Sequence, residues 1–297
     1  MEQVRGHPEI LPGFRWYDIP LEDCSIRTAI GGYGPPLLLL HGHPQTHLTW
    51  HKVAPVLAKK FTVIAPDLRG YGDSSKPDGG PGHINYSKRT MALDQIQVMK
   101  ALGFGHFSIV GHDRGARVAH RMALDHPDAV DSLALLDIAP TATMYARTDM
   151  EFARRYFWWF FLIQPYPCPS ALSQVIRISF SISISKDRFK NSDAVDPLVL
   201  QEYRRCFANP ATRHAICEDY RAAASIDLIH DAIDKDKRIQ VPLLILWGAK
   251  GTVGALYDVL ETWADKAIDV RGHAIDCGHS PQEEAPDQLL NALKSFL

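Results

Sequence analysis

Asp113 stands at the centre of GHDRG (111–115), where two glycines bracket a charged side chain. The apolar run FSIV (107–110) precedes it, and ARVAHRMAL (116–124), with the apolar spacing of a helix, follows it. A strand, a sharp turn and a helix in this order are typical of a nucleophile elbow, which exposes the central side chain. The alternative interpretation of GHDRG is a glycine-bracketed loop with an N-capping aspartate. The elbow interpretation predicts that Asp113 is a nucleophile.

The predicted nucleophile needs a general base and an acid that orients this base. His279 lies in DCGHSPQEEAP (276–286), after a strand-like segment and before a final helix, where the histidine arrives in the chain order nucleophile, acid, histidine. An ordinary surface histidine is the alternative. The acid often follows the penultimate strand, but WGAKGTVG (247–254) contains no carboxylate. Asp137, which ends SLALLD (132–137), is the natural substitute.

Backbone amides that could stabilise an oxyanion lie next to two strand ends. HGHP (41–44) places the His43 N–H at one end, and Arg114 supplies a second N–H directly after the nucleophile. The histidines His41, His43 and His47 could also be interpreted as a metal cluster, but their spacing matches neither a zinc finger nor an H-E-x-x-H motif. The sequence therefore predicts an oxyanion hole, and neither a metal nor a cofactor.

The choice of aspartate decides the chemistry. A serine needs a base to remove its proton, whereas a carboxylate is already an anion at neutral pH. Asp113 can therefore displace a leaving group from a saturated carbon and form an ester, which water activated by His279 would hydrolyse while Asp137 stabilises the imidazolium. This reaction suits carbon–halogen bonds and epoxides. It does not suit ordinary esters, because attack on their carbonyl would form an anhydride.

Arg114 and Arg117 predict an acidic substrate. Positions i and i+3 share a helix face, so both guanidinium groups can converge beside the nucleophile and hold a carboxylate by forked hydrogen bonds. The alternative is that one or both are solvated, or paired with acids such as Asp67 or Asp137. If both arginines bind substrate, the substrate is a small acid with a leaving group on the adjacent carbon.

Five apolar runs are expected to form the strands that position these residues, at 36–42, 61–67, 107–113, 132–138 and 242–248. Runs this apolar suit strands buried on both faces of a parallel sheet. Helical patterns at 86–102 and 114–125 lie between them. The sequence predicts an α/β fold with a mostly parallel, doubly wound sheet, which binds ligands at the carboxyl ends of its strands.

The alternation of strands and helices stops near Pro140 and resumes near Val241. The segment between them is rich in Trp, Phe, Tyr and Arg, and it is too long for a structureless loop. We expect a helical cap over residues 140–240, inserted into a core domain made of residues 1–139 and 241–297.

Composition excludes several classes of partner. The chain has 297 residues, a formal net charge of −2 and no long run of one sign, which argues against nucleic acid. Its longest apolar stretches are too short to span a membrane, and its start lacks the apolar core of a secretory signal. Five cysteines without a C-x-x-C pair suggest reduced thiols. We expect a cytoplasmic protein that acts on a small molecule.

Motifs along nearly the whole chain identify a family. They are HGHPQT, APDLRGYGDSSKP, VGHDRGAR, LDIAPT, FFLIQP, EDYRAAASIDL and CGHSPQEEAP. With them the chain resembles the haloacetate and fluoroacetate dehalogenases of the α/β-hydrolase fold. The resemblance implies that Asp113, Asp137 and His279 form the triad and that Arg114 and Arg117 bind the carboxylate. It also implies a homodimer.

The resemblance further implies a halide pocket built by the cap from a His-Trp pair and a tyrosine. Trp159 and Tyr220 match two of these positions, while Trp158 stands where the family usually has the histidine. An indole N–H can donate to an anion, but it is bulkier than an imidazole and cannot become charged, which weakens the expectation that fluoride is released. Adjacent helical residues face different ways, so one tryptophan of the pair is expected to belong to the cap core.

The leading hypothesis is a cofactor-independent hydrolase that converts 2-haloacids into 2-hydroxy acids and halide. The nearest alternative is an epoxide hydrolase, which would need two cap tyrosines to protonate the opening oxygen. Tyr220 is one candidate, and Tyr145, Tyr156 and Tyr203 are candidates for the other. A non-catalytic binding protein on the same scaffold is the third hypothesis, although a binder has no chemical need for the triad.

Overall fold

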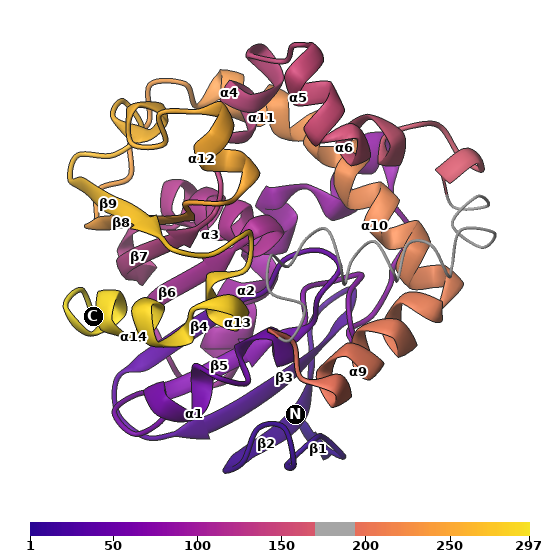
Figure 1. Ribbon diagram of the computed structural model, residues 1–297. Helices are drawn as coiled ribbons and strands as arrows, with labels where there is room; N and C mark the ends of the chain where they lie inside the picture. Colours follow the sequence, from indigo (N-terminus) through magenta and orange to yellow (C-terminus); the bar gives the residue numbers. More distant parts are fainter. Residues whose placement is uncertain (170–193) are drawn as a thin grey trace.

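Nine strands of the computed structural model form one sheet, in the order β1-β2-β3-β5-β4-β6-β7-β8-β9 (Figure 1). The structure describes residues 1–169 and 194–297. The strands are β1 (Glu2–Val4), β2 (Phe14–Pro20), β3 (Ser25–Gly32), β4 (Pro36–Leu40), β5 (Thr62–Pro66), β6 (Phe107–His112), β7 (Val130–Leu136), β8 (Leu243–Gly248) and β9 (Val270–Ile275). Strands β4 to β9 pair in parallel, and β1, β2 and β3 add an antiparallel edge.

The five predicted strands correspond to β4, β5, β6, β7 and β8, and the predicted mostly parallel α/β fold is confirmed. The register aligns their carboxyl ends, because Leu40 pairs with Gly111, and His112 with Leu136. The segments that follow β4, β6 and β7 therefore emerge side by side. These are the segments that hold the candidate catalytic residues.

Helices cover both faces of the sheet. Outside residues 140–240 they are α1 (Ala54–Leu57), α2 (Lys88–Ala101), α3 (Asp113–Asp125), α12 (Thr252–Leu256), α13 (Pro281–Glu284) and α14 (Pro286–Lys294). The helical patterns predicted at 86–102 and 114–125 are α2 and α3. None of the helices in the described ranges combines the length and apolarity needed to cross a membrane.

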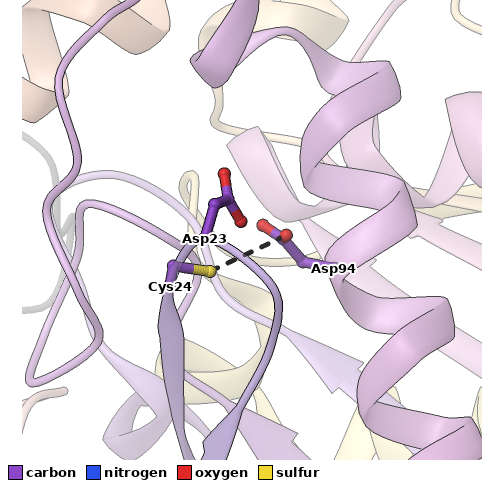
Figure 2. Close-up of side chains that lie close together, drawn as sticks. All are labelled: Asp23, Cys24 and Asp94. Carbon is purple, nitrogen blue, oxygen red and sulfur yellow. Dashed lines mark hydrogen bonds between the residues drawn. The ribbon is translucent and has the colours of Figure 1, made fainter.

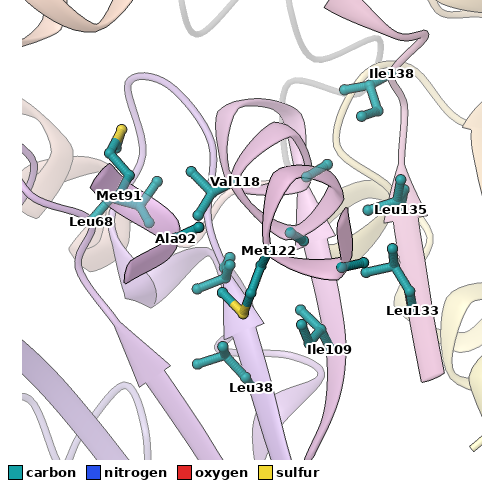
Figure 3. Packing of buried hydrophobic residues seen from close by; sticks show 14 of the residues in the cluster. Leu38, Leu68, Met91, Ala92, Ile109, Val118, Met122, Leu133, Leu135 and Ile138 are labelled. Carbon is teal, nitrogen blue, oxygen red and sulfur yellow. The ribbon is translucent and has the colours of Figure 1, made fainter. Parts of the chain in front are cut away.

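Side chains of alternate strand residues build two cores. Leu38, Ile109 and Leu133 belong to one core, together with Val118 and Met122 of α3, which face them in Figure 3. The neighbouring residues on the same strands point to the other face, where α1 and α14 pack. This double burial explains why the central strands are almost wholly apolar. It also fixes α3, and therefore its first residue, rigidly against the sheet.

Residues 140–240, here called the inserted segment, are helical where they are described. The helices are α4 (Thr141–Ala146), α5 (Met150–Arg155), α6 (Phe157–Leu162), α9 (Pro197–Ala208), α10 (Pro210–Ala223) and α11 (Ile226–Ile233). In Figure 1 they lie outside the sheet, along the top and right of the view. Part of the predicted cap, residues 170–193, falls outside the described residues, and the division into two domains stays a prediction.

Candidate active site

Asp113 is the first residue of α3, directly after β6, as an elbow requires. Its own backbone carries the unusual conformation, with φ of 48°, in the left-handed region that few residues other than glycine adopt. The flanking Gly115 is needed for a close approach between two elements. A Cβ there would lie 2.4 Å from the carbonyl oxygen of His41, so glycine lets α3 approach the end of β4.

His279 bridges the two predicted acids. Its Nδ1 lies 2.5 Å from Asp137 Oδ2, and because an ionised carboxylate only accepts, Nδ1 carries the hydrogen. The opposite ring nitrogen, Nε2, lies 3.4 Å from Asp113 Oδ2. In the neutral imidazole Nε2 is therefore the basic nitrogen, and it faces the predicted nucleophile. The structure thus brings the three predicted triad residues together.

Asp137 follows β7 and is held in place by the neighbouring strand. Its Oδ1 accepts the backbone N–H of Gly248, the last residue of β8, at 2.9 Å. The penultimate strand, β8, is followed by no carboxylate of its own. Its last residue instead holds Asp137, the carboxylate that follows β7. Asp137 also has a positive φ, of 52°, and among the described residues only His83 and Asp113 share this feature outside glycine. Backbone strain of this kind gathers at functional sites.

The predicted oxyanion hole is partly assembled around Asp113. The His43 N–H donates to Asp113 Oδ1 at 2.9 Å, so one carboxylate oxygen already occupies the predicted hole. The Arg114 N–H lies in the first turn of α3, where backbone amides have no acceptor within the helix. Gly42 allows this approach, because a Cβ there would come within 2.5 Å of Asp113 Cβ.

His112, directly before the nucleophile, stabilises the His279 loop. Its Nε2 lies 2.8 Å from the backbone carbonyl oxygen of His279, and its Nδ1 lies 3.2 Å from the amide nitrogen of Gln282. A carbonyl oxygen only accepts and an amide N–H donates, so His112 is neutral with its hydrogen on Nε2. Sequence reasoning did not single out this residue.

Arg114 is fully buried and paired with Asp219 of α10. Its Nε and Nη2 donate to the two Asp219 carboxylate oxygens at 2.8 and 2.7 Å, and Nη2 also reaches the Asp219 backbone oxygen at 2.9 Å. Lys88 forms a second, very short ion pair with the same carboxylate, and the Tyr71 hydroxyl donates to it at 2.7 Å. The acid partner is therefore neither Asp67 nor Asp137, the two that the sequence suggested. The remaining nitrogen of Arg114, Nη1, is buried without a hydrogen-bond partner among the described residues.

Arg117, one helical turn further on, is also buried, but none of the ion pairs formed by the described residues includes it. Its Nη1 donates to the Ala139 backbone oxygen at 3.0 Å and to Thr141 Oγ1 at 2.8 Å, which are neutral acceptors. Burial, reinforced by the charge of Arg114, lowers the pKa of the Arg117 guanidinium. A buried cation with only neutral acceptors lies one turn after the predicted nucleophile.

The residues matched to the halide pocket lie over the two arginines. The Tyr220 ring lies 4.3 Å from the guanidinium carbon of Arg114, and the Trp159 ring 4.8 Å from that of Arg117. The two rings are 6.4 Å apart and nearly perpendicular. Trp158 is half-buried, and its described ring contacts are with the phenylalanines 157 and 161. The structure therefore brings Trp159 and Tyr220 together above the arginines and places Trp158 against neighbours of its own helix.

The histidines that resembled a metal cluster have other partners. His41 Nδ1 bonds the Gly42 backbone oxygen, and its Nε2 accepts the Leu68 N–H at 3.0 Å. His47 Nδ1 lies 2.8 Å from Asp67, and its Nε2 accepts the Trp16 indole N–H at 2.9 Å. Both ring nitrogens of His41 and of His47 are therefore used in positioning the loops after β4 and β5.

Asp23, Cys24 and Asp94 form the one group of described residues whose ligand atoms are close enough to hold a metal ion, within 4.8 Å of one another (Figure 2). The Arg69 guanidinium bonds both carboxylates, at 3.0 Å to Asp23 and 2.6 Å to Asp94. Burial, with the charge of Asp94, raises the pKa of the Cys24 thiol to about 12, so it is a poor ligand. Arg69 already supplies the positive charge that a metal would bring.

Asp219 is the main site residue that sequence reasoning missed. It directly precedes Tyr220 in EDYR (218–221), and α10 is buried along most of its length although it carries several charged residues. Buried charges in a helix need partners, so the charged residues interspersed among its apolar ones were the sequence feature that could have pointed to Asp219. Naming the partner required the folded chain, because Arg114 lies far from Asp219 in sequence.

Comparison with known proteins adds four similarities. A family model described as the alpha/beta hydrolase fold matches residues 35–286. The chain is 42% identical to a fluoroacetate dehalogenase of Burkholderia sp, over 96% of this chain and 94% of that protein. It is 32% identical to a soluble epoxide hydrolase of Corynebacterium sp. (strain C12), over 99% and 98%. A solved structure of a proposed acyltransferase from Salmonella enterica is 55% identical, with a TM-score of 0.98, covering 100% of this chain and 98% of that one.

Proposed function

The chain belongs to the α/β-hydrolase family, and on that premise we propose that this hydrolase removes halide from small 2-haloacids through an ester on Asp113. The similarity to a fluoroacetate dehalogenase supports the proposal. The aspartate nucleophile supports it too, because attack on a carbonyl, as in acyl transfer, would give an anhydride.

The observation that carries the proposal is the buried charge of Arg117. A buried guanidinium without an ion-pair partner is costly, since no carboxylate of the described residues contacts it and repays its transfer from water. The nearby charge of Asp113 acts on Arg117 without bonding it. A substrate carboxylate beside Arg117 would supply that partner through charge-assisted hydrogen bonds. Arg114 can contribute its Nη1, because Asp219 occupies only its other two nitrogens. The site therefore favours an acid over a neutral substrate.

In the first step Asp113 Oδ2 attacks the carbon that carries the halogen, from the side opposite the halogen. The carbon–oxygen bond forms as the carbon–halogen bond breaks, and halide leaves with the bonding electron pair. Oδ1 stays on the His43 N–H, where it is already held at 2.9 Å. The indole N–H of Trp159 and the hydroxyl of Tyr220 are the proposed donors to the departing halide.

In the second step His279 takes a proton from water at Nε2, and the hydroxide attacks Asp113 Cγ. Negative charge develops on Oδ1, which the N–H groups of His43 and Arg114 stabilise. The imidazolium, which Asp137 stabilises at 2.5 Å, returns its proton to the departing alkoxide. The 2-hydroxy acid leaves, and Asp113 loses its acid proton to solvent.

Halide release by the purified protein tests the proposal. Chloroacetate, bromoacetate and fluoroacetate are the substrates, and chloroacetamide, which has the same shape without the charge, is the matched control. We expect halide from the acids and much less from the amide, with none above background from Asp113→Asn. Equal turnover of acid and amide would show that the substrate carboxylate is not recognised. No halide release from any haloacid would refute the dehalogenase assignment.

An epoxide hydrolase is the second candidate. The Corynebacterium relative supports it, and so does Tyr220, whose ring lies 5.5 Å from the ring of His43 beside the oxyanion hole. Of the tyrosines considered for the second acid, Tyr203 donates its hydroxyl to Glu283 at 2.7 Å and is therefore engaged elsewhere. Release of diol from a simple epoxide at a rate above halide release from the haloacids would favour this candidate.

A further inference from the structure

Tyr145 has a buried hydroxyl with no hydrogen-bond partner among the described residues. A buried hydroxyl usually finds a partner, because leaving it unsatisfied costs about 1–3 kcal/mol. Burial also raises the pKa of Tyr145 to about 12, so the group keeps its hydrogen at neutral pH. The hydroxyl is therefore a donor without an acceptor.

The surroundings of this hydroxyl belong to the proposed carboxylate site. Tyr145 lies in α4, the helix that wraps Arg117 through Thr141 Oγ1 at 2.8 Å and Met144 Sδ at 3.2 Å. Its ring lies 5.1 Å from the ring of Trp159, the residue that stacks on Arg117. The positive charges of Arg114 and Arg117 lower the pKa of the hydroxyl, whereas the carboxylates of Asp227 and Asp219 raise it.

Three buried donors of this region share the same property. The Tyr145 hydroxyl, Arg114 Nη1 and Arg117 Nε are each without a hydrogen-bond partner among the residues that the structure describes. The two guanidinium nitrogens can only donate, and the hydrogen of the Tyr145 hydroxyl also needs an acceptor, so the component that would satisfy all three is an acceptor. A carboxylate offers about four lone-pair sites on two oxygens, which is enough for all three.

We propose that Tyr145 is a third donor to the substrate carboxylate, beside Arg114 and Arg117. The proposal rests on the function proposed above and deepens it by adding a specificity-determining residue. A hydroxyl that instead helped the leaving group would act on the halogen or on an epoxide oxygen. The two roles predict different kinetic effects. A donor to the carboxylate changes the binding of every haloacid alike. A donor to the leaving group instead changes the rate of the reaction, and most for the substrate with the poorest leaving group.

Tyr145→Phe tests the proposal, because it removes one oxygen and keeps the ring. Glycolate, the expected product of haloacetates, serves as a probe that binds without reaction. We expect its dissociation constant, measured by titration calorimetry, to rise about tenfold. The KM for chloroacetate, bromoacetate and fluoroacetate should rise by a similar factor, with kcat within about twofold for each. The melting temperature should be unchanged or higher, because the hydroxyl has no hydrogen bond to lose within residues 1–169 and 194–297.

Two control variants separate this role from packing. Thr212→Val removes another buried hydroxyl that lacks a hydrogen-bond partner among the described residues, and we expect unchanged glycolate affinity. Tyr86→Phe removes a hydroxyl that donates to the Pro77 backbone oxygen at 2.8 Å, and it should lower the melting temperature without changing affinity.

Unchanged glycolate affinity in Tyr145→Phe would overturn the proposal. So would a loss of kcat that grows from bromoacetate to fluoroacetate at constant KM, which would assign the hydroxyl to the leaving group. A parent protein that binds glycolate but releases no halide would contradict the proposed reaction alone, and the affinity comparison would still decide the role of Tyr145. A parent that does not bind glycolate would contradict both.

Discussion

The Asp219 carboxylate binds the Arg114 guanidinium with both oxygens, at 2.7 and 2.8 Å, and neither side chain is exposed to solvent. Arg114 follows the nucleophile in the elbow helix α3, whereas Asp219 belongs to α10 of the inserted segment and precedes Tyr220. This ion pair therefore connects the elbow to the helix that carries the proposed leaving-group residue. It also leaves Arg117 as the cation whose charge a substrate can neutralise.

Asp219→Asn should destabilise the protein by about 3–5 kcal/mol, because it leaves the buried Arg114 without its carboxylate and Lys88 with only the more distant Asp227, at 3.6 Å. The free energy of unfolding in urea measures this loss. Asp18→Asn, which breaks a partly exposed pair with Arg27, is the control and should cost at most about 1 kcal/mol. A loss for Asp219→Asn no larger than that of the control would mean that the buried pair contributes nothing.

The same variant has an expected pH dependence. Burial alone would raise the pKa of Asp219, but Arg114 and Lys88 hold it well below the ordinary value. A depressed carboxyl pKa contributes stability that is present above the unfolded pKa of about 3.9 and is lost as pH falls through lower values. The difference in stability between parent and Asp219→Asn should therefore be constant from about pH 5 upward and shrink below about pH 4. A difference that is independent of pH would contradict this assignment.

Arg114→Met and Arg117→Met should have opposite effects on stability. Arg117 forms no ion pair in the described part of the chain, so its replacement removes a buried charge without depriving a bonded acid of its partner, and it should leave the melting temperature unchanged or higher. Replacement of Arg114 deprives the buried Asp219 of its main partner and should lower the melting temperature. Both variants should raise the KM for chloroacetate, by about a hundredfold for Arg117→Met. An unchanged KM for either variant would remove that arginine from the carboxylate site.

The raised pKa of Glu283 predicts that the protein loses stability as the pH rises. It is fully buried in α13, four residues after His279, and burial raises its pKa to about 7 although Tyr203 and Gln45 donate to it. The folded state then holds a proton that the unfolded state releases between pH 4.5 and 7, so stability falls across this range as pH rises. The loss should reach about 3 kcal/mol.

Glu283→Gln keeps the hydrogen-bonding shape without a titrating proton, and it should remove this dependence. Urea unfolding of the parent and the variant from pH 5 to 8 checks the prediction. Parallel curves for the two proteins would show that Glu283 does not titrate in this range.

Trp158→His should favour release of fluoride. It restores the residue that the resembled family usually has at this position, and an imidazolium is a stronger donor to fluoride than an indole. We expect the ratio of kcat/KM for fluoroacetate to that for chloroacetate to increase about tenfold or more. Trp158→Phe, which removes the donor, should not increase it. Equal ratios in the parent and Trp158→His would place residue 158 outside the leaving-group pocket.

The parallel centre of the sheet could be predicted because strands that are buried on both faces consist of continuous apolar residues, such as PLLLL at 36–40. The antiparallel edge could not. Strand β2 alternates buried and exposed residues and includes Arg15 and Asp18, so it lacks the continuous apolar run that marks the central strands. The elbow, the orienting acid and the base were recoverable because Asp113 and Asp137 directly follow strands and His279 comes four residues after the end of β9.

The contacts that decide specificity could not be predicted. Spacing alone placed Arg114 and Arg117 on one helix face, yet their partners come from α4 and α10, which are remote in sequence. For the same reason the sequence offered three tyrosines as partners of Tyr220 and no pattern to choose among them. The structure separates two of them by their hydroxyls: that of Tyr203 is bonded to Glu283, whereas that of Tyr145 has no hydrogen-bond partner among the described residues.

The central claim is that Asp113 forms an ester with a haloacid and that His279 is needed to hydrolyse it. Intact-mass spectrometry of His279→Asn after incubation with chloroacetate tests both parts, because this variant should be alkylated and then arrested. The account predicts a stable gain of one carboxymethyl group, absent when Asp113 is also replaced by Asn. A folded His279→Asn variant that gains no mass from any haloacetate, or one whose adduct persists without Asp113, would contradict it.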